Sequence, residues 1–121
     1  MKVVRIAEVR EEPNTSALMI GGTVTRQGVV PPEMAKNFNC GIVNFGRGAR
    51  NKFHAHTSDQ VLIITSGIGI VATEHEQREV SVGDVAFIPA GEKHWHGARK
   101  ESPMSHITIT AKDSKTTQLE N

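Results

Sequence analysis

The chain has 121 residues and a mass of 13.2 kDa, enough for one domain with its own hydrophobic core, to which apolar residues contribute 37%. Its 14 basic and 13 acidic residues nearly cancel, which excludes the clustered basic surface expected of a nucleic-acid-binding protein. No apolar stretch approaches the roughly 18 residues of a membrane span, no signal peptide is visible, and the single Cys40 favours a reduced, cytoplasmic setting.

Short β-branched runs separated by glycine and proline cover most of the chain. They predict strands over residues 18–24, 41–45, 60–65, 68–73, 85–88 and 105–110, a pattern typical of an all-β barrel or sandwich. A loop or irregular arm is expected over residues 26–40. The chain is predicted to form a single domain over 1–121, with a barrel core at about 38–111 and a frayed polar tail at 112–121.

Two histidine pairs with the same spacing are the most informative feature of the sequence. His54 and His56 are two residues apart, and so are His94 and His96. On an extended strand such a pair points to one face, so each pair aims two imidazoles at one point, as a metal site requires. If the two strands face each other across a barrel, three or four imidazoles converge. The amide oxygen of Gln60 is a further candidate ligand.

Two more features bear on chemistry. His96 would be neutral beside a cation and able to accept a proton, which makes it a candidate general base, although it could instead only orient the site. His106 shares the parity of Thr108 and Thr110. It therefore lies either in a polar barrel lumen or on an exposed face.

The histidine pairs fall within two longer motifs. The first is GARNKFHAHTSDQVLIITSG at residues 48–67, and the second is GDVAFIPAGEKHWHGA at residues 83–98. Both resemble the two cupin motifs at every spacing. Gln60 stands where glutamate is usual, and Ala98 stands where asparagine is usual. On these motifs the chain is identified as a small single-domain cupin.

This resemblance implies a double-stranded β-helix, or jelly-roll barrel, that holds one divalent metal ion in its mouth. By position, the metal ligands would be His54, His56, Gln60 and His94. Cupins of this size are commonly homodimers. Residues 91–98, GEKHWHGA, together with Met104-Ser105-His106 and the glutamine ligand, further resemble the bacterial manganese-dependent cupin hydroxynitrile lyases. That likeness implies acid and base roles for His96 and His106.

The sequence therefore predicts a metal-dependent lyase acting on a small molecule. The alternatives are a metal-dependent dioxygenase or other cupin of sugar or aromatic breakdown, and a cupin that binds a small ligand without turning it over. Manganese is implied by resemblance, while Fe, Ni, Zn and Cu also suit nitrogen and oxygen donors. An all-neutral ligand set would leave the ion its full +2 charge and make it a stronger Lewis acid. A homodimer is expected, with no nucleic-acid or membrane partner.

Overall fold

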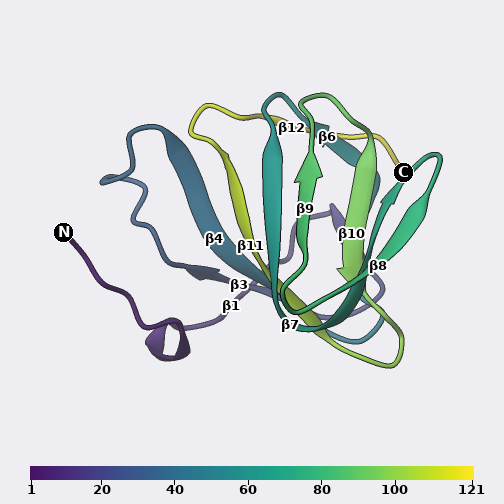
Figure 1. The fold of residues 1–121 in the computed structure, drawn as a ribbon, viewed down its shortest axis with the longest axis horizontal. Coiled ribbons are helices and arrows are strands. Elements are labelled where there is room, and N and C mark those ends of the chain that lie inside the picture. The colour runs from purple at the N-terminus through teal and green to yellow at the C-terminus, as the bar shows by residue number, and fades with distance from the viewer.

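The computed structural model describes all of residues 1–121, and it is almost entirely β (Figure 1). One 3-10 turn, η1 (Ile6–Glu8), precedes the strands. These are β1 (Glu12–Pro13), β2 (Met19–Ile20), β3 (Val24–Gly28), β4 (Phe38–Phe45), β5 (Arg50–Asn51), β6 (His54–His56), β7 (Gln60–Thr73), β8 (Gln77–Ser81), β9 (Val85–Ile88), β10 (His94–Ala98), β11 (Met104–Ala111) and β12 (Thr116–Gln118). The predicted all-β class is confirmed. The structure contains no helix that is long and apolar enough to span a bilayer.

The strands pair antiparallel and form two curled sheets that share the long strand β7. The first half of β7 pairs with β11 and β9, and its second half pairs with β10 and β8. The change of sheet occurs at Gly67, whose φ of 73° lies in the left-handed region. A Cβ atom there would overlap the carbonyl of Pro103. The predicted strands 60–65 and 68–73 are thus two parts of one strand.

The remaining strands extend the two sheets outward. Beyond β11 the first sheet continues through β4 and β3 to β1, and beyond β10 the second sheet continues to β5 and β2 on one path and to β6 and β12 on another. In Figure 1, β4, β11 and β7 lie side by side and curl around the interior, and the two termini lie at opposite sides of the barrel.

Two expectations for the N-terminal third are wrong. The predicted loop over 26–40 is too long, because β3 extends to Gly28 and β4 begins at Phe38. The predicted strand over 18–24 is interrupted by a turn, where Gly21 has a φ of 84°. β2 pairs with β5, and β3 pairs with β4. Both segments therefore complete the chain's own sheets.

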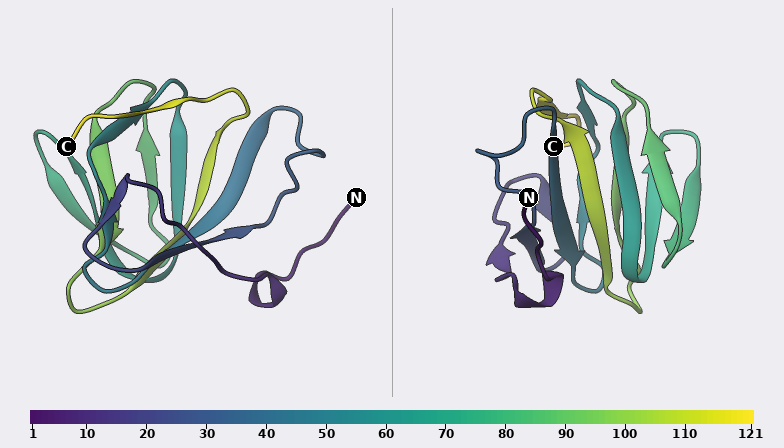
Figure 2. Two further views of the ribbon diagram at one scale, coloured as in Figure 1. Left: turned by 180° about the vertical axis from the view of Figure 1, so that it is seen from behind. Right: turned by 60° about the vertical axis from the view of Figure 1, so that its left-hand side comes forward.

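The expectation of a frayed tail over 112–121 is also wrong. β12 pairs antiparallel with β6, with Thr116 opposite His56 and Gln118 opposite His54. The C-terminal segment crosses one end of the barrel beside β6 (Figures 1 and 2). All three β12 side chains are exposed, so the strand carries no hydrophobic alternation by which the sequence could reveal it.

The barrel interior is part apolar and part polar. The apolar cluster consists of Val24, Phe45, Ala49, Ile64, Val80, Ala98 and Met104. The buried polar residues are Gln27, Asn51, Gln60, His54, His94, His96 and His106. Buried polar groups are more informative than buried apolar ones because they need partners. Four buried imidazoles in so small a domain indicate a site.

Candidate metal centre and adjoining histidine pair

Three imidazoles from two neighbouring strands converge inside the barrel. His54 and His56 lie on β6, and His94 on β10 stands directly opposite His54 in the antiparallel register. One ligand atom of each residue lies within 4.8 Å of the others. His54 and His94 are buried and His56 is half-buried. The convergence expected from the paired histidines is therefore present, and these three side chains could hold one ion.

The hydrogen bonds of His54 and His94 direct one nitrogen of each ring to the cluster. Nδ1 of His54 lies 2.6 Å from the carbonyl oxygen of Lys52, and Nδ1 of His94 lies 2.8 Å from that of Glu92. A carbonyl oxygen can only accept, so both Nδ1 atoms carry a proton and donate it. In a neutral ring the lone pair is then on Nε2, as a metal ligand requires.

His56 also has a hydrogen-bond partner at Nδ1, but here the partner is a hydroxyl, which can accept or donate. Its Nδ1 lies 2.9 Å from the hydroxyl oxygen of Thr116. Its Nε2 is buried and has no hydrogen-bond partner. A buried polar atom without a partner is unfavourable, and a bound cation would supply the missing interaction. The donor set therefore fits a divalent transition metal.

Gln60 approaches the same cluster from the first sheet. Its Nε2 donates to the hydroxyl of Thr108 at 2.9 Å, so its Oε1 is turned to Nε2 of His94, 3.0 Å away. Both of these atoms are acceptors when His94 is neutral, and two lone pairs that face each other at this distance repel. A cation between them would remove the repulsion, so the geometry suits Gln60 as a fourth ligand. Its ligand role remains a prediction.

All of these rings favour the neutral form, because burial penalises the charged imidazolium. Burial lowers the pKa of His54 from 6.5 to about 4, with the neighbouring His94 and His56 acting in the same direction. Burial likewise lowers the pKa of His56 and of His94. Their lone pairs are therefore free for a metal at neutral pH.

His96 and His106 form a second pair beside the cluster. Nε2 of His106 lies 2.9 Å from Nδ1 of His96, and the ring of His96 stacks on that of His94 at a centroid distance of 5.6 Å. Burial lowers the pKa of His96 well below 6.5 and that of His106 to about 4. Two neutral rings can share the bond only if one donates and the other accepts. Of the two predicted locations for His106, the polar lumen is the observed one.

Asn51 is a member of the site that the sequence did not reveal. It is buried on β5, and its Oδ1 accepts the backbone N–H of His96 at 2.8 Å. That bond turns its Nδ2 toward the His96 ring, 3.4 Å from Nδ1 and 3.2 Å from Nε2. Nδ2 is a donor, so it can donate to whichever of the two ring nitrogens carries the lone pair. A lone asparagine before a histidine pair carries no sequence signal for this role.

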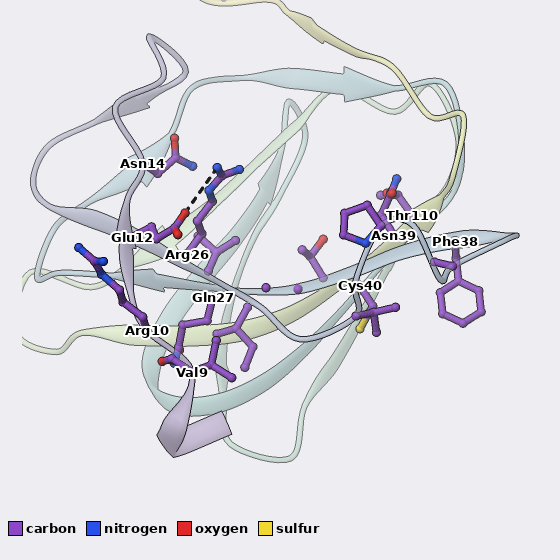
Figure 3. A pocket seen from close by; sticks show the side chains of 18 residues that line it. Val9, Arg10, Glu12, Asn14, Arg26, Gln27, Phe38, Asn39, Cys40 and Thr110 are labelled. Carbon is purple, nitrogen blue, oxygen red and sulfur yellow. Dashed lines mark hydrogen bonds and ion pairs between the residues drawn. The ribbon is translucent and has the colours of Figure 1, made fainter. Parts of the chain in front are cut away.

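A cavity of about 550 Å³ lies on the β3–β4 side of the barrel (Figure 3), and none of the site histidines lines it. Two of its lining residues are neighbours of the site: Val43 is registered opposite His106, and Thr108 accepts the Gln60 amide. Figure 3 shows Arg26 and Glu12 paired at one end of the cavity. The volume is within the range of small-molecule sites.

Comparison with known proteins agrees with this architecture. Residues 41–110 match the model of the cupin domain. Over 68 residues the chain is 43% identical to an (R)-mandelonitrile lyase from Granulicella tundricola, covering 55% of this chain and 52% of that protein. This match therefore spans about half of the curated relative's length.

Solved structures show the same fold. A cupin-like protein from Thermotoga maritima superposes with a TM-score of 0.85 at 29% identity, over 93% of this chain and 86% of that one. A polyketide cyclase from Streptomyces resistomycificus gives a TM-score of 0.88 at 17% identity, over 100% and 87% of the two chains. With its barrel and the family match over more than half its length, this chain belongs to the cupin domain family.

Proposed function

We propose that this chain is a metal-dependent lyase of the hydroxynitrile type, with a small molecule as its substrate. The ion would be divalent and held by the four predicted ligands, His54, His56, Gln60 and His94. The observation that carries the lyase proposal is the hydrogen-bonded pair of neutral histidines, His96 and His106, beside the converging imidazoles. The mandelonitrile lyase relative supports an aromatic cyanohydrin as the substrate class.

A bound divalent ion would supply positive charge that stabilises negative charge on a substrate oxygen. Manganese is favoured by the resemblance to the lyases, and Fe, Ni, Zn and Cu are also compatible with the donor set. The cavity on the β3–β4 side would receive the aromatic part of the substrate between the half-buried Val43 and the polar Thr108 and Thr110.

The two histidines would move the proton. In cyanohydrin cleavage, His96 accepts the hydroxyl proton while the bond between the carbinol carbon and the nitrile carbon breaks, and the electron pair of that bond leaves with cyanide. The organic product is the aldehyde. The proton passes back from the histidine pair to cyanide, so hydrogen cyanide is released. The 2.9 Å hydrogen bond to His106 gives this proton a second place to reside.

Elemental analysis of the purified protein tests the metal, beside a His54→Ala, His94→Ala double variant. We expect about one equivalent of metal in the wild type and none in the variant. No metal in the wild type, even after soaking with excess Mn, Ni and Zn, would overturn the metal proposal. Iron or copper together with oxygen uptake would instead indicate the dioxygenase alternative.

Replacing His96 tests the lyase step. The His96→Ala variant should retain its metal but lose about 10²–10⁴-fold in the rate of mandelonitrile cleavage, which is the usual contribution of a general base. The variant's metal content, measured in the same samples, separates loss of chemistry from loss of the ion. Full turnover in this variant would show that His96 is not the base.

A further inference from the structure

The C-terminal segment is built against the strand that carries two of the candidate ligands. Thr57 N–H donates to the carbonyl of Lys115 at 2.9 Å, and Lys115 N–H donates to the Thr57 hydroxyl at 2.9 Å. At the other end of β6, Leu119 N–H donates to the carbonyl of Phe53 at 2.8 Å. β12 lies between these contacts and pairs with all three residues of β6.

Glu120 clamps the end of this segment. Its two carboxylate oxygens accept from the Arg50 guanidinium at 2.8 and 3.2 Å, and one of them accepts the backbone N–H of Phe53 at 2.8 Å. The guanidinium lies 4.7 Å from the ring centroid of Trp95. Bidentate pairs of this kind are geometrically specific. The clamp therefore fixes the register of β12 along β6.

His56 depends on this segment in a way that the other two candidate ligands do not. The Nδ1 partners of His54 and His94 are carbonyls two residues earlier in the chain, within each histidine's own segment. The Nδ1 partner of His56 is the hydroxyl of Thr116, 60 residues away on β12. His56 is also the ring whose Nε2 is buried without a partner.

We propose that Thr116 is a positioning residue of the metal centre. When Nε2 of His56 binds an ion, Nδ1 must carry the proton and needs an acceptor. The Thr116 hydroxyl oxygen can accept that proton's hydrogen bond, so it supports the tautomer that metal binding needs and holds the direction of the ring. This inference rests on the proposed metal binding, and it makes the C-terminal segment part of the site.

Three single variants test the role of the hydroxyl. Thr116→Val removes the oxygen but keeps the shape, Thr116→Ser restores the oxygen, and Thr117→Val makes the same change on the neighbouring β12 residue, whose side chain points to the opposite face. The probe is Co²⁺, with its dissociation constant measured by chelator competition and its coordination followed by visible absorption. We expect Thr116→Val to weaken binding about 10- to 100-fold, with the other two variants close to wild type.

The metal-free protein gives a second, independent readout. Long-range ¹⁵N correlation spectra of the imidazoles report which nitrogen carries the proton, and we expect Thr116→Val to change the His56 pattern while Thr116→Ser preserves it. If Thr116→Val binds Co²⁺ as tightly as the wild type, or if Thr116→Ser is as weak as Thr116→Val, the inference is wrong. If the wild type binds no Co²⁺ at all, the proposed function fails, and the ¹⁵N pattern then decides the Thr116–His56 contact alone.

Discussion

Gln60 is the single residue that sets the charge of the candidate centre, because the other candidate ligands are neutral imidazoles. Its Oε1 lies 3.0 Å from Nε2 of His94. A Gln60→Glu variant keeps the shape and can accept from the Thr108 hydroxyl, but it adds a negative charge. We expect Mn²⁺ binding to tighten by about tenfold through this attraction. Mandelonitrile cleavage should slow, because the carboxylate cancels part of the positive charge that polarises the substrate.

Chelator competition and a cleavage assay measure the two effects of Gln60→Glu. Gln77→Glu, the same change on an exposed residue of β8, serves as the control and should alter neither quantity. Unchanged Mn²⁺ affinity in Gln60→Glu would show that the amide is not a ligand.

The buried histidines also set how the metal-free protein responds to acid. Burial lowers the pKa of both His54 and His106 from 6.5 to about 4 in the folded state. Between pH 6.5 and about pH 4 the unfolded chain binds more protons at these histidines than the folded chain does. The free energy of unfolding therefore falls as the pH drops through this range. His106 alone should contribute roughly 3 kcal/mol to this loss.

Urea unfolding of the metal-free protein at several values between about pH 7 and pH 4 measures this slope. The His106→Asn variant should show a shallower slope because it lacks one of the titrating groups. A stability that stays level across the window would contradict the assignment of these rings as buried and neutral.

The candidate ligands were predictable because their spacing obeys the strand period. His54 and His56 are two residues apart on β6 and so share one face, and the structure places His94 on β10, the strand paired with β6. Their partners were not predictable in the same way. Thr116 is 60 residues from His56 and lies in a polar segment, and Asn51 has no pattern around it. Such contacts depend on the folded chain, in which distant segments meet.

At the scale of elements, the central feature is the passage of β7 from one sheet to the other at Gly67. This glycine has a φ of 73°, and an added Cβ would overlap the Pro103 carbonyl. Gly83 also has a positive φ, of 95°, but nothing lies within 4 Å of its added Cβ. The two glycines therefore separate the cost of backbone strain from the cost of a steric clash.

We expect Gly83→Ala to lower the free energy of unfolding by about 1–2 kcal/mol, the strain of a left-handed residue. Gly67→Ala should cost about twice as much or more, because backbone must also move at the sheet junction. Denaturant unfolding of the two variants measures the difference. Equal costs would show that the junction can relax, and the tight approach to Pro103 would then not hold β7 in both sheets.

The elements predicted from sequence were those with clear apolar runs, such as 41–45, 85–88 and 105–110. Continuity through Gly67 was hidden, because a glycine within an apolar run also signals a turn. β12 was missed entirely, because all three of its side chains are exposed and its pairing with β6 keeps it in place. β3 was predicted only at the buried Val24, because the residues that follow, Thr-Arg-Gln-Gly, have no apolar alternation. Propensity and pattern report burial, and strands at a sheet edge bury little.

At the scale of the whole molecule, the outer face of the first sheet is apolar over four adjacent strands. In register across it lie Phe87, Val61, Ile109 and Cys40 in one row, and Val85, Ile63, Ile107 and Ile42 in the next. Phe87 and Val85 on β9 are each 62% exposed. Toward β4 the face is covered, because Ile42 is buried, and the residues between are half-buried. An apolar face that is exposed at β9 and partly exposed across β7 and β11 is typical of an interaction surface, and a second copy of the same chain is its commonest occupant.

We predict that this face forms the interface of a homodimer, which a Phe87→Glu variant should convert to monomer, because the charge would be buried without a partner. Val82→Glu is the matched control, since Val82 is 64% exposed but lies in the turn between β8 and β9, outside the two rows. Light scattering over a dilution series measures both. A wild type that is monomeric at every concentration would rule out the homodimer, and a Phe87→Glu variant that remains dimeric would place the interface elsewhere. Because the histidines point into the barrel and this face points out, metal content should be the same in both variants.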